Sequence, residues 1–313
     1  MVSARRISRR DALRLAAGGG VVLLAGCSED DGDGATGADA RSPAPTALET
    51  ERADTAIVRQ VDHILLRVDD AAASFALLTE TLQIPVAWPL FEYRGFHSGA
   101  AGCGSVNLEV LQHANGDVPP FASAPGTYLI GIAFEPVTVD GAIAQLDARG
   151  IGHSEPFDDG LNDTIAWTSV DIDPTPDTPI RLLVKYKFDQ DARRAMLATQ
   201  LRQRAGGPLG ITAPVTIEIG VRDVAAAAER WQTLFDPIRP VGPTPAYWEL
   251  GDVPAVRLVQ ATVDAMQRVE IGVVSLPAAV DALRARDLLA DEGEGWADIT
   301  GFDGALRLIQ AGL

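Results

Sequence analysis

Apolar and polar residues alternate in four short stretches, and each of these precedes a stretch in which alanine and leucine recur with helical spacing. The alternating stretches are residues 61–68, 128–135, 215–222 and 268–275. The helical stretches are residues 69–82, 139–150, 223–235 and 276–288. A period of two is typical of a strand, and a period near 3.6 is typical of a helix with one buried face. The pattern therefore predicts four strand–helix units.

The expected helices also carry terminal signals. Asp70, Asp140, Asp223 and Ser275 stand at the expected helix starts, where a side-chain oxygen can accept a hydrogen bond from a free backbone N–H. Gly150 follows the second helix, as a C-terminal glycine does. These residues predict where the four helices begin and where the second one ends.

Each unit closes with a further alternating stretch. The closing stretches are residues 106–112, 179–186, 255–261 and 305–311. The space before them accommodates two more short strands, for which residues 86–93, 95–101 and 164–172 are candidates. The predicted unit is thus β-α-β-β-β, repeated four times. Residues 188–207 predict a helix that joins the second and third units.

Four tandem β-α-β-β-β units resemble the vicinal oxygen chelate superfamily, which includes glyoxalases, bleomycin resistance proteins and extradiol dioxygenases. The opening "VDHILLRVDDAAASFALLTETLQIPVAWP" is similar to the start of a glyoxalase-like domain. The resemblance extends from about residue 58 to the end and implies an α+β fold in which two units pair into a curved sheet around a cup. It implies one glyoxalase-like domain at 58–187, a linker helix at 188–210 and a second, degenerate domain at 211–313.

The N-terminal residues predict export. Arg9 and Arg10 precede an apolar run from Ala12 to Ala25 that is too short and glycine-rich for a comfortable membrane span. The paired arginines suggest the twin-arginine route, and "LAGC" resembles a bacterial lipoprotein box. Residues 1–26 are therefore predicted to be a signal peptide. Lipid on Cys27 would anchor the chain to the outer face of the cytoplasmic membrane, or on the periplasmic side. The alternative is an uncleaved anchor or a cytoplasmic tail.

Residues 27–57 are acidic, rich in glycine, alanine and proline, and almost devoid of large apolar side chains. Such a segment buries too little surface to offset its ordering entropy. It is predicted to be a disordered tether between the membrane and the folded part.

Composition limits the partners. The chain has 43 acidic and 26 basic residues, with a formal net charge of −17, which argues against binding to nucleic acid or to anionic lipid. Its two cysteines leave Cys103 without a disulfide partner if Cys27 carries lipid. No Ser-His-Asp order, phosphate loop, dinucleotide-binding glycine pattern or CxxC is present.

The resemblance places metal ligands on the first and last strands of each unit, facing the cup. In the first unit these positions are His63 and Glu109, and alternation puts His63, Leu65 and Arg67 on one face. Glu109 would serve as a ligand or as a catalytic base. His97, on the third strand, is a candidate further ligand.

The second unit departs from the family pattern, because the corresponding positions fall on or near Leu129 and on Arg181. Leucine has no donor atom and arginine stays protonated. Arg181 could instead pair with Glu109 across the cup without a metal.

A ligand pocket is the other interpretation of the same face. Aromatic residues could form its apolar wall, although ordinary core packing is an alternative for each of them. The candidate ligand-binding residues are His63, Trp88, Phe91, Tyr93, His97, Glu109, Trp167 and Arg181.

In the second pair of units no metal site is expected. The ligand positions fall on Thr216, Arg257, Arg268 and Arg307, and Glu218 and Glu270 share their face. This set predicts an internal salt-bridge network, with a pocket for an anionic ligand as the alternative.

Two functions follow from the first pair of units. One is the binding of a small molecule in the cup without a metal. The other is a divalent-metal-dependent lyase or dioxygenase-type enzyme that uses His63 and Glu109 to hold one manganese, iron, zinc or nickel ion. A homodimer is compatible with either.

Overall fold

The computed structural model describes residues 55–93, 95–113, 122–160, 166–242, 246–251 and 254–312. These residues belong to one compact unit, Pro45–Leu313. The expected signal peptide, Cys27 and the tether up to residue 54 lie outside the described residues. Ala56 and Ile57, at the end of the expected tether, are buried in the core. Among the described helices, none combines the length and the apolar character that a membrane span requires.

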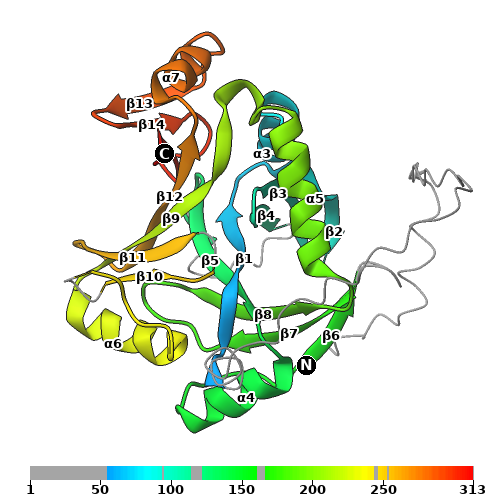
Figure 1. The fold of residues 1–313 in the computed structure, drawn as a ribbon, viewed down its shortest axis with the longest axis vertical. Coiled ribbons are helices and arrows are strands. Elements are labelled where there is room, and N and C mark those ends of the chain that lie inside the picture. Colours follow the sequence, from blue (N-terminus) through cyan, green and yellow to red (C-terminus); the bar gives the residue numbers. More distant parts are fainter. Residues whose placement is uncertain are drawn as a thin grey trace, which may run out of the picture. The chain divides into compact units, whose positions relative to one another are not determined.

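The first two units form one eight-stranded sheet (Figure 1). Its strands are β1 (Val58–Arg67), β2 (Val86–Tyr93), β3 (Phe96–Cys103), β4 (Val106–His113), β5 (Tyr128–Pro136), β6 (Phe157–Gly160), β7 (Ala166–Ile172) and β8 (Ile180–Tyr186). Their order is β2-β3-β4-β1-β5-β8-β7-β6. The first and last strands of each unit pair in parallel, and the two units meet where β1 runs antiparallel to β5.

The last two units form a second sheet with the same arrangement of strands. Its strands are β9 (Ile211–Val221), β10 (Tyr247–Glu249), β11 (Ala255–Gln260), β12 (Ala265–Val273), β13 (Leu289–Gly293), β14 (Trp296–Ile299) and β15 (Leu306–Gln310). Their order is β10-β11-β9-β12-β15-β14-β13. The described part of the third unit has two strands after its helix instead of three. The predicted α+β class, with units paired into two curved sheets, is confirmed.

The helices lie where the periodicity predicts them. They are α3 (Ala71–Ala76), continued by the π-helical turn η1 (Leu77–Thr81), α4 (Val139–Ala148), α5 (Gln190–Gln203), the 3₁₀ turn η3 (Gly207–Leu209), α6 (Val224–Phe235) and α7 (Leu276–Arg284). The side chains of Asp70, Asp223 and Ser275 cap their helices as expected. The prediction for Asp140 was wrong. Thr138 caps α4 by accepting from Gly141 N at 3.1 Å, which leaves Asp140 inside the first turn.

Both faces of the first sheet carry apolar side chains. Ile64 and Leu66 of β1 belong to the large core on the helix side, which also includes residues of the second sheet. Leu65, between them, joins a smaller cluster on the opposite face, with Leu111, Ile130, Ala133 and Val184. That second face is the wall of the cup, so the alternation along β1 separates structural residues from residues available to a site.

Helix α5 connects the two sheets and contacts both β3 and β9 (Figure 1). The chain leaves α5 through Gly206, whose φ of 75° is left-handed. A Cβ at this position would lie 2.3 Å from Ile211 N, so glycine is required where β9 begins. The turn fixes α5 against the first sheet, a position that matters for the site.

Candidate functional site

A cavity of about 520 Å³ lies on the concave face of the first sheet, and we call it the cup. Residues of β1 to β4, β6 to β8 and the start of α5 line it. Its aromatic wall consists of Trp88, Phe91, Phe96, Phe157, Trp167, Tyr186 and Phe188. Three of the predicted aromatic residues, Trp88, Phe91 and Trp167, are among them. The side chain of Tyr93 lies outside the described residues.

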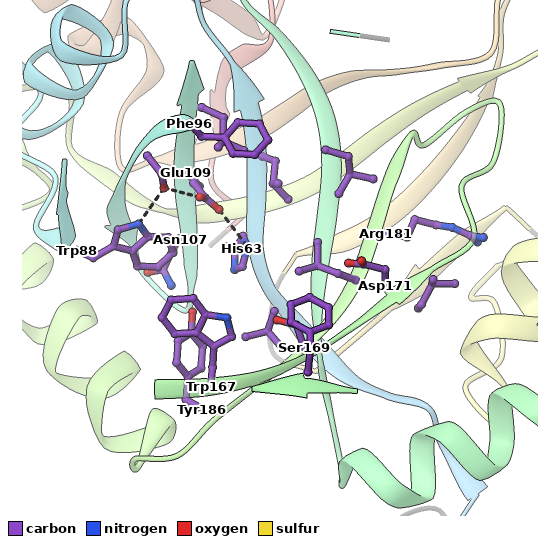
Figure 2. Close-up of a pocket in the computed structure, with 18 of the residues that line it drawn as sticks. His63, Trp88, Phe96, Asn107, Glu109, Trp167, Ser169, Asp171, Arg181 and Tyr186 are labelled. Atoms are coloured by element: carbon purple, nitrogen blue, oxygen red, sulfur yellow. Dashed lines mark hydrogen bonds and ion pairs between the residues drawn. The ribbon is translucent and has the colours of Figure 1, made fainter. Parts of the chain in front are cut away.

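His63 and Glu109 meet at the base of the cup, on the neighbouring parallel strands β1 and β4 (Figure 2). His63 Nε2 lies 3.1 Å from Glu109 Oε2, and His63 Nδ1 lies 2.7 Å from Asp62 Oδ2. His63 is 6% exposed and Asp62 is fully buried. One imidazole ring therefore contacts two carboxylates, one on each side.

The contact between His63 and its own neighbour depends on an irregularity in β1. Val61 pairs with Phe134 and His63 with Ala133, so Asp62 is an extra residue in the ladder between β1 and β5. Such a bulge breaks the alternation of side chains and redirects one of them. It lets Asp62 reach the ring of His63, where a regular strand would point the two side chains to opposite faces.

Asp62 is held in turn by groups from β8 and α5. Its Oδ1 accepts from Gln190 Nε2 at 2.9 Å and from Arg194 Nη1 at 3.1 Å. Its Oδ2 accepts from the hydroxyl of Tyr186 at 3.3 Å. Arg194 also forms an ion pair with Glu135, which is 2% exposed. The linker helix thus supplies the counter-charge behind the cup.

These contacts fix the protonation of the base of the cup. Burial alone lowers the pKa of His63, but its hydrogen bonds to Asp62 and Glu109 outweigh burial and raise the pKa to about 10. Both ring nitrogens therefore carry protons at neutral pH, and each donates to a carboxylate. Burial, with the nearby charges of Asp62 and Glu109, raises the pKa of Tyr186 well above 10, so its phenol stays neutral.

A second set of contacts extends from Glu109 toward the wall. Ser98 Oγ donates to Glu109 Oε1 at 2.5 Å, and Trp88 Nε1 approaches Ser98 Oγ at 3.4 Å (Figure 2). The rings of Trp88 and His63 make an edge contact with centroids 5.6 Å apart. Ser98 thus orients Glu109, and Trp88 covers the ring of His63.

The structure does not bring His97 into the cup. Its neighbours on β3, Phe96 and Ser98, line the cavity, so His97 points to the opposite face and is absent from the lining. The prediction that His97 is a further metal ligand in the cup is therefore wrong.

The two positions expected in the second unit, on or near Leu129 and on Arg181, lie beside residues whose side chains face the cup. Leu129 belongs to the core on the helix side, while Ile130 faces the cup. On β8, the cup face is carried by Leu182 and its alternate neighbours, and Arg181 borders the cavity. Arg181 Nε donates to the carbonyl oxygen of Asp173 at 3.1 Å, so the expected pair with Glu109 does not form.

In the second sheet the predicted salt-bridge network is confirmed. Arg257 bonds to both Glu218 at 2.7 Å and Glu270 at 2.6 Å, and Arg268 pairs with Glu218 at 3.0 Å. Arg307 pairs with Asp298 at 2.7 Å. These charges compensate one another on the face that corresponds to the cup.

Several residues in and behind the cup were not predicted from the sequence. Among them, Asp62 could have been noticed, because it is an acid inside an apolar strand. Gln190 and Arg194 lie more than a hundred residues away on a helix that was expected only as a linker. Ser98 and Asn107 looked like ordinary polar positions in short strands.

The donor atoms of the cup do not fit a three-ligand metal site. No group of three or more histidine, cysteine or acidic residues in the described parts of the chain could hold an ion. Both nitrogens of His63 are directed at carboxylates. Across the seam, the residue paired with His63 is Ala133, which has no side-chain donor atom. Transition-metal sites normally use three or four protein ligands.

Comparison with solved structures identifies the architecture. A hypothetical protein from Staphylococcus aureus matches with a TM-score of 0.56 and 14% identity, over 80% of this chain and 99% of that one. A variant of homoprotocatechuate 2,3-dioxygenase from Brevibacterium fuscum matches with a TM-score of 0.55 and 15% identity, over 81% and 72%. These likenesses show the fold. The chain has a fold like that of this extradiol dioxygenase, and identity this low carries no activity with it. No protein-family model and no curated protein matches the chain.

Proposed function

We propose that the protein binds a small, largely apolar molecule in the cup without a metal ion. The observation that carries this proposal is the aromatic cavity of about 520 Å³ closed at its base by the His63–Glu109 pair. Ligand pockets typically measure about 300–1,000 Å³ and combine apolar walls with a few polar groups. The cup has this composition.

The charges at the base support a site that works without an ion. In a metal site a nitrogen of the imidazole faces the ion. Here each nitrogen of His63 faces a carboxylate, because Nδ1 lies 2.7 Å from Asp62 Oδ2 and Nε2 lies 3.1 Å from Glu109 Oε2. Both carboxylates also accept hydrogen bonds from other protein groups, so they have partners without a metal.

The N-terminal sequence sets the proposed location. A twin-arginine signal followed by Cys27 would export the folded protein and attach it through lipid, with the cup outside the cytoplasm. The mass of the N-terminal peptide from cells tests this. A lipid-modified Cys27 as the first residue supports the proposal, and an intact Met1 or an unmodified cysteine contradicts it.

Filling the cup tests the binding proposal. Val184→Phe adds a ring inside the cavity, and Val274→Phe adds the same ring at a position that is 68% exposed. Small aromatic compounds should raise the Tm of the natural chain and of Val274→Phe, and should quench the fluorescence of Trp88 and Trp167. Val184→Phe should lose both effects. If no aromatic compound shifts either signal in the natural chain, the proposal fails.

A second candidate is a divalent-metal-dependent lyase or dioxygenase-type enzyme. It is favoured by the position of His63 and Glu109 on adjacent strands of a dioxygenase-like fold. Elemental analysis of protein produced with manganese, iron, zinc and nickel, beside a His63→Ala/Glu109→Ala double variant, separates the candidates. One ion per chain that the double variant loses would replace the first proposal with this one.

A further inference from the structure

Asn107 is a polar side chain of the cup that the contacts described above leave unused. It lies on β4 opposite His63 in the ladder with β1, it is 4% exposed, and it lines the cavity (Figure 2). Its amide makes no hydrogen bond to any side chain or backbone group among the described residues. An amide can donate two hydrogen bonds and accept two, so this side chain, which opens onto the cavity, can bind a polar group of a ligand.

The neighbouring polar groups are already engaged. Both nitrogens of His63 face carboxylates, Ser98 donates to Glu109, and the hydroxyl of Tyr186 and the amide nitrogen of Gln190 donate to Asp62. The oxygen of Gln190 lacks a partner, but it is sealed from the cavity surface. Ser169 lies across the cup on β7. Its hydroxyl can donate or accept, so it discriminates little between ligand groups that donate and those that accept.

Glu109 stands two residues from Asn107 on the same face of β4. Its carboxylate accepts from His63 and Ser98, which leaves acceptor capacity, because a carboxylate offers about four lone-pair sites. Two residues along a strand span about 6.6 Å. A single planar group between them can accept from the Asn107 amide and donate to Glu109, with each hydrogen bond about 2.9 Å long.

The charge at this end of the cup excludes one class of ligand. The ring of His63 lies between Asp62 and Glu109, and Arg194 behind them is paired with Asp62 and Glu135. Arg193 also lines the cavity, but its guanidinium donates to the carbonyl oxygen of Ala87 and lies over the ring of Phe188. A ligand carboxylate would face Glu109 and would be repelled by it.

We infer that the cup selects neutral aromatic molecules carrying a group that both accepts and donates a hydrogen bond, as a primary carboxamide does. The oxygen of that group accepts from Asn107 and its N–H donates to Glu109, while the ring packs against Trp88 and the other aromatic side chains. This inference rests on the proposed function and adds the chemical class of the ligand and the residue that selects it.

Calorimetric titration of the full chain with benzamide, benzoate and toluene tests the inference. The three probes share one ring and differ in the group that would meet Asn107 and Glu109. Benzamide should bind about tenfold more tightly than toluene and benzoate, because it alone satisfies both side chains. In Asn107→Leu, which keeps the volume and removes the amide, the preference of benzamide over toluene should fall to about twofold or less.

The outcomes separate the inference from the proposed function. If toluene binds and benzoate binds as tightly as benzamide, or the preference survives in Asn107→Leu, the inference is overturned while the cup remains a binding site. If none of the three probes binds, both are overturned. The comparison of probes in the natural chain does not depend on how well the variant folds.

Discussion

At the scale of single residues, the base of the cup is the ring of His63 between two carboxylates. Asp62 and Glu109 both contact the ring of His63, and the side chains of all three are at most 13% exposed. A buried charge is tolerated only when it is paired and hydrogen-bonded. The stability of this base should therefore depend on the proton.

We expect stability to fall as the pH rises above 6.5, in protein treated with a chelator. The folded pKa of His63, about 10, is above its unfolded value, so its contribution is fully present below about pH 6.5 and is lost as the pH rises through 10. Urea unfolding between pH 6.5 and 9 measures the slope. Higher pH is avoided because Cys103, whose pKa burial raises to about 12, would add a pH dependence of its own there.

Variants identify the source of that slope. Glu109→Gln removes a negative charge from beside His63 and should flatten the slope, because the folded pKa of His63 then lies closer to its unfolded value. His153→Gln removes a histidine on the surface and should leave most of the slope in place. An identical slope in Glu109→Gln would show that the proton on His63 does not govern stability.

Asn107 gives a contrasting prediction. Asn107→Leu should change the stability of the ligand-free protein by less than about 1 kcal/mol, because its amide opens onto the cavity and has no protein partner to lose. Ser98→Ala, on the neighbouring strand, should destabilise it by about 1–2 kcal/mol, because Glu109 loses a donor. Thermal or chemical unfolding of both variants measures the contrast. A destabilised Asn107→Leu would mean that the amide has a structural partner.

At the scale of elements, α5 is part of the site. Its side chains Gln190 and Arg194 bind Asp62, and Arg194 also binds Glu135 of β5. A helix expected only to join two pairs of units therefore holds the charge behind the cup. The sequence offered no local signal for this, because the partners lie 59 to 132 residues apart.

Replacing Arg194 should test this role. Arg194→Met should cost about 1.5–3 kcal/mol of unfolding free energy, because Asp62 and Glu135 each lose a charged donor, although Glu135 keeps Arg59 and Lys185. Arg202→Met, on the same helix, removes a solvent-facing arginine that contacts Thr199 and should cost less than about 0.5 kcal/mol. Denaturant unfolding of the two variants gives the comparison. Equal, small effects would show that α5 is only a connection.

Strand register explains which parts of the site could be predicted. His63 and Glu109 were placed on the cup face correctly because β1 and β4 pair in regular parallel register at these residues. On β5 the prediction could not choose between Leu129 and its neighbour Ile130, which lies on the cup face, because a shift of one residue moves every side chain to the other face. The ladder between β1 and β5 has irregularities that alternation alone cannot reveal. The fold was predictable because the order of strands and helices in the four units does not depend on such local shifts.

At the scale of the whole molecule, the two sheets share one core. Trp231 of α6 packs against Phe134 of β5, with ring centroids 6.4 Å apart. Its Nε1 donates to Asp177 Oδ2 at 2.7 Å, and Asp177 is fully buried in the segment before β8. These contacts connect a helix of the third unit to the second unit.

Weakening that connection should lower the stability of both sheets together. Trp231→Phe removes the indole donor from Asp177 and should cost about 1–3 kcal/mol. Cup fluorescence from Trp88 and Trp167 and the circular dichroism of the whole chain should still report one shared transition, at lower denaturant. Val274→Ala, at an exposed position, should leave the midpoint unchanged. Two separated transitions would contradict a shared core.

The attachment of α5 has a consequence for how this protein can be divided. A gene fragment ending at Tyr186 would encode all eight strands around the cup. It would lack Gln190 and Arg194, so Asp62 would lose two of its buried partners. The first sheet in its present sequence is therefore not a portable module. Recombination that transplants it must carry α5 along, or must first replace Asp62.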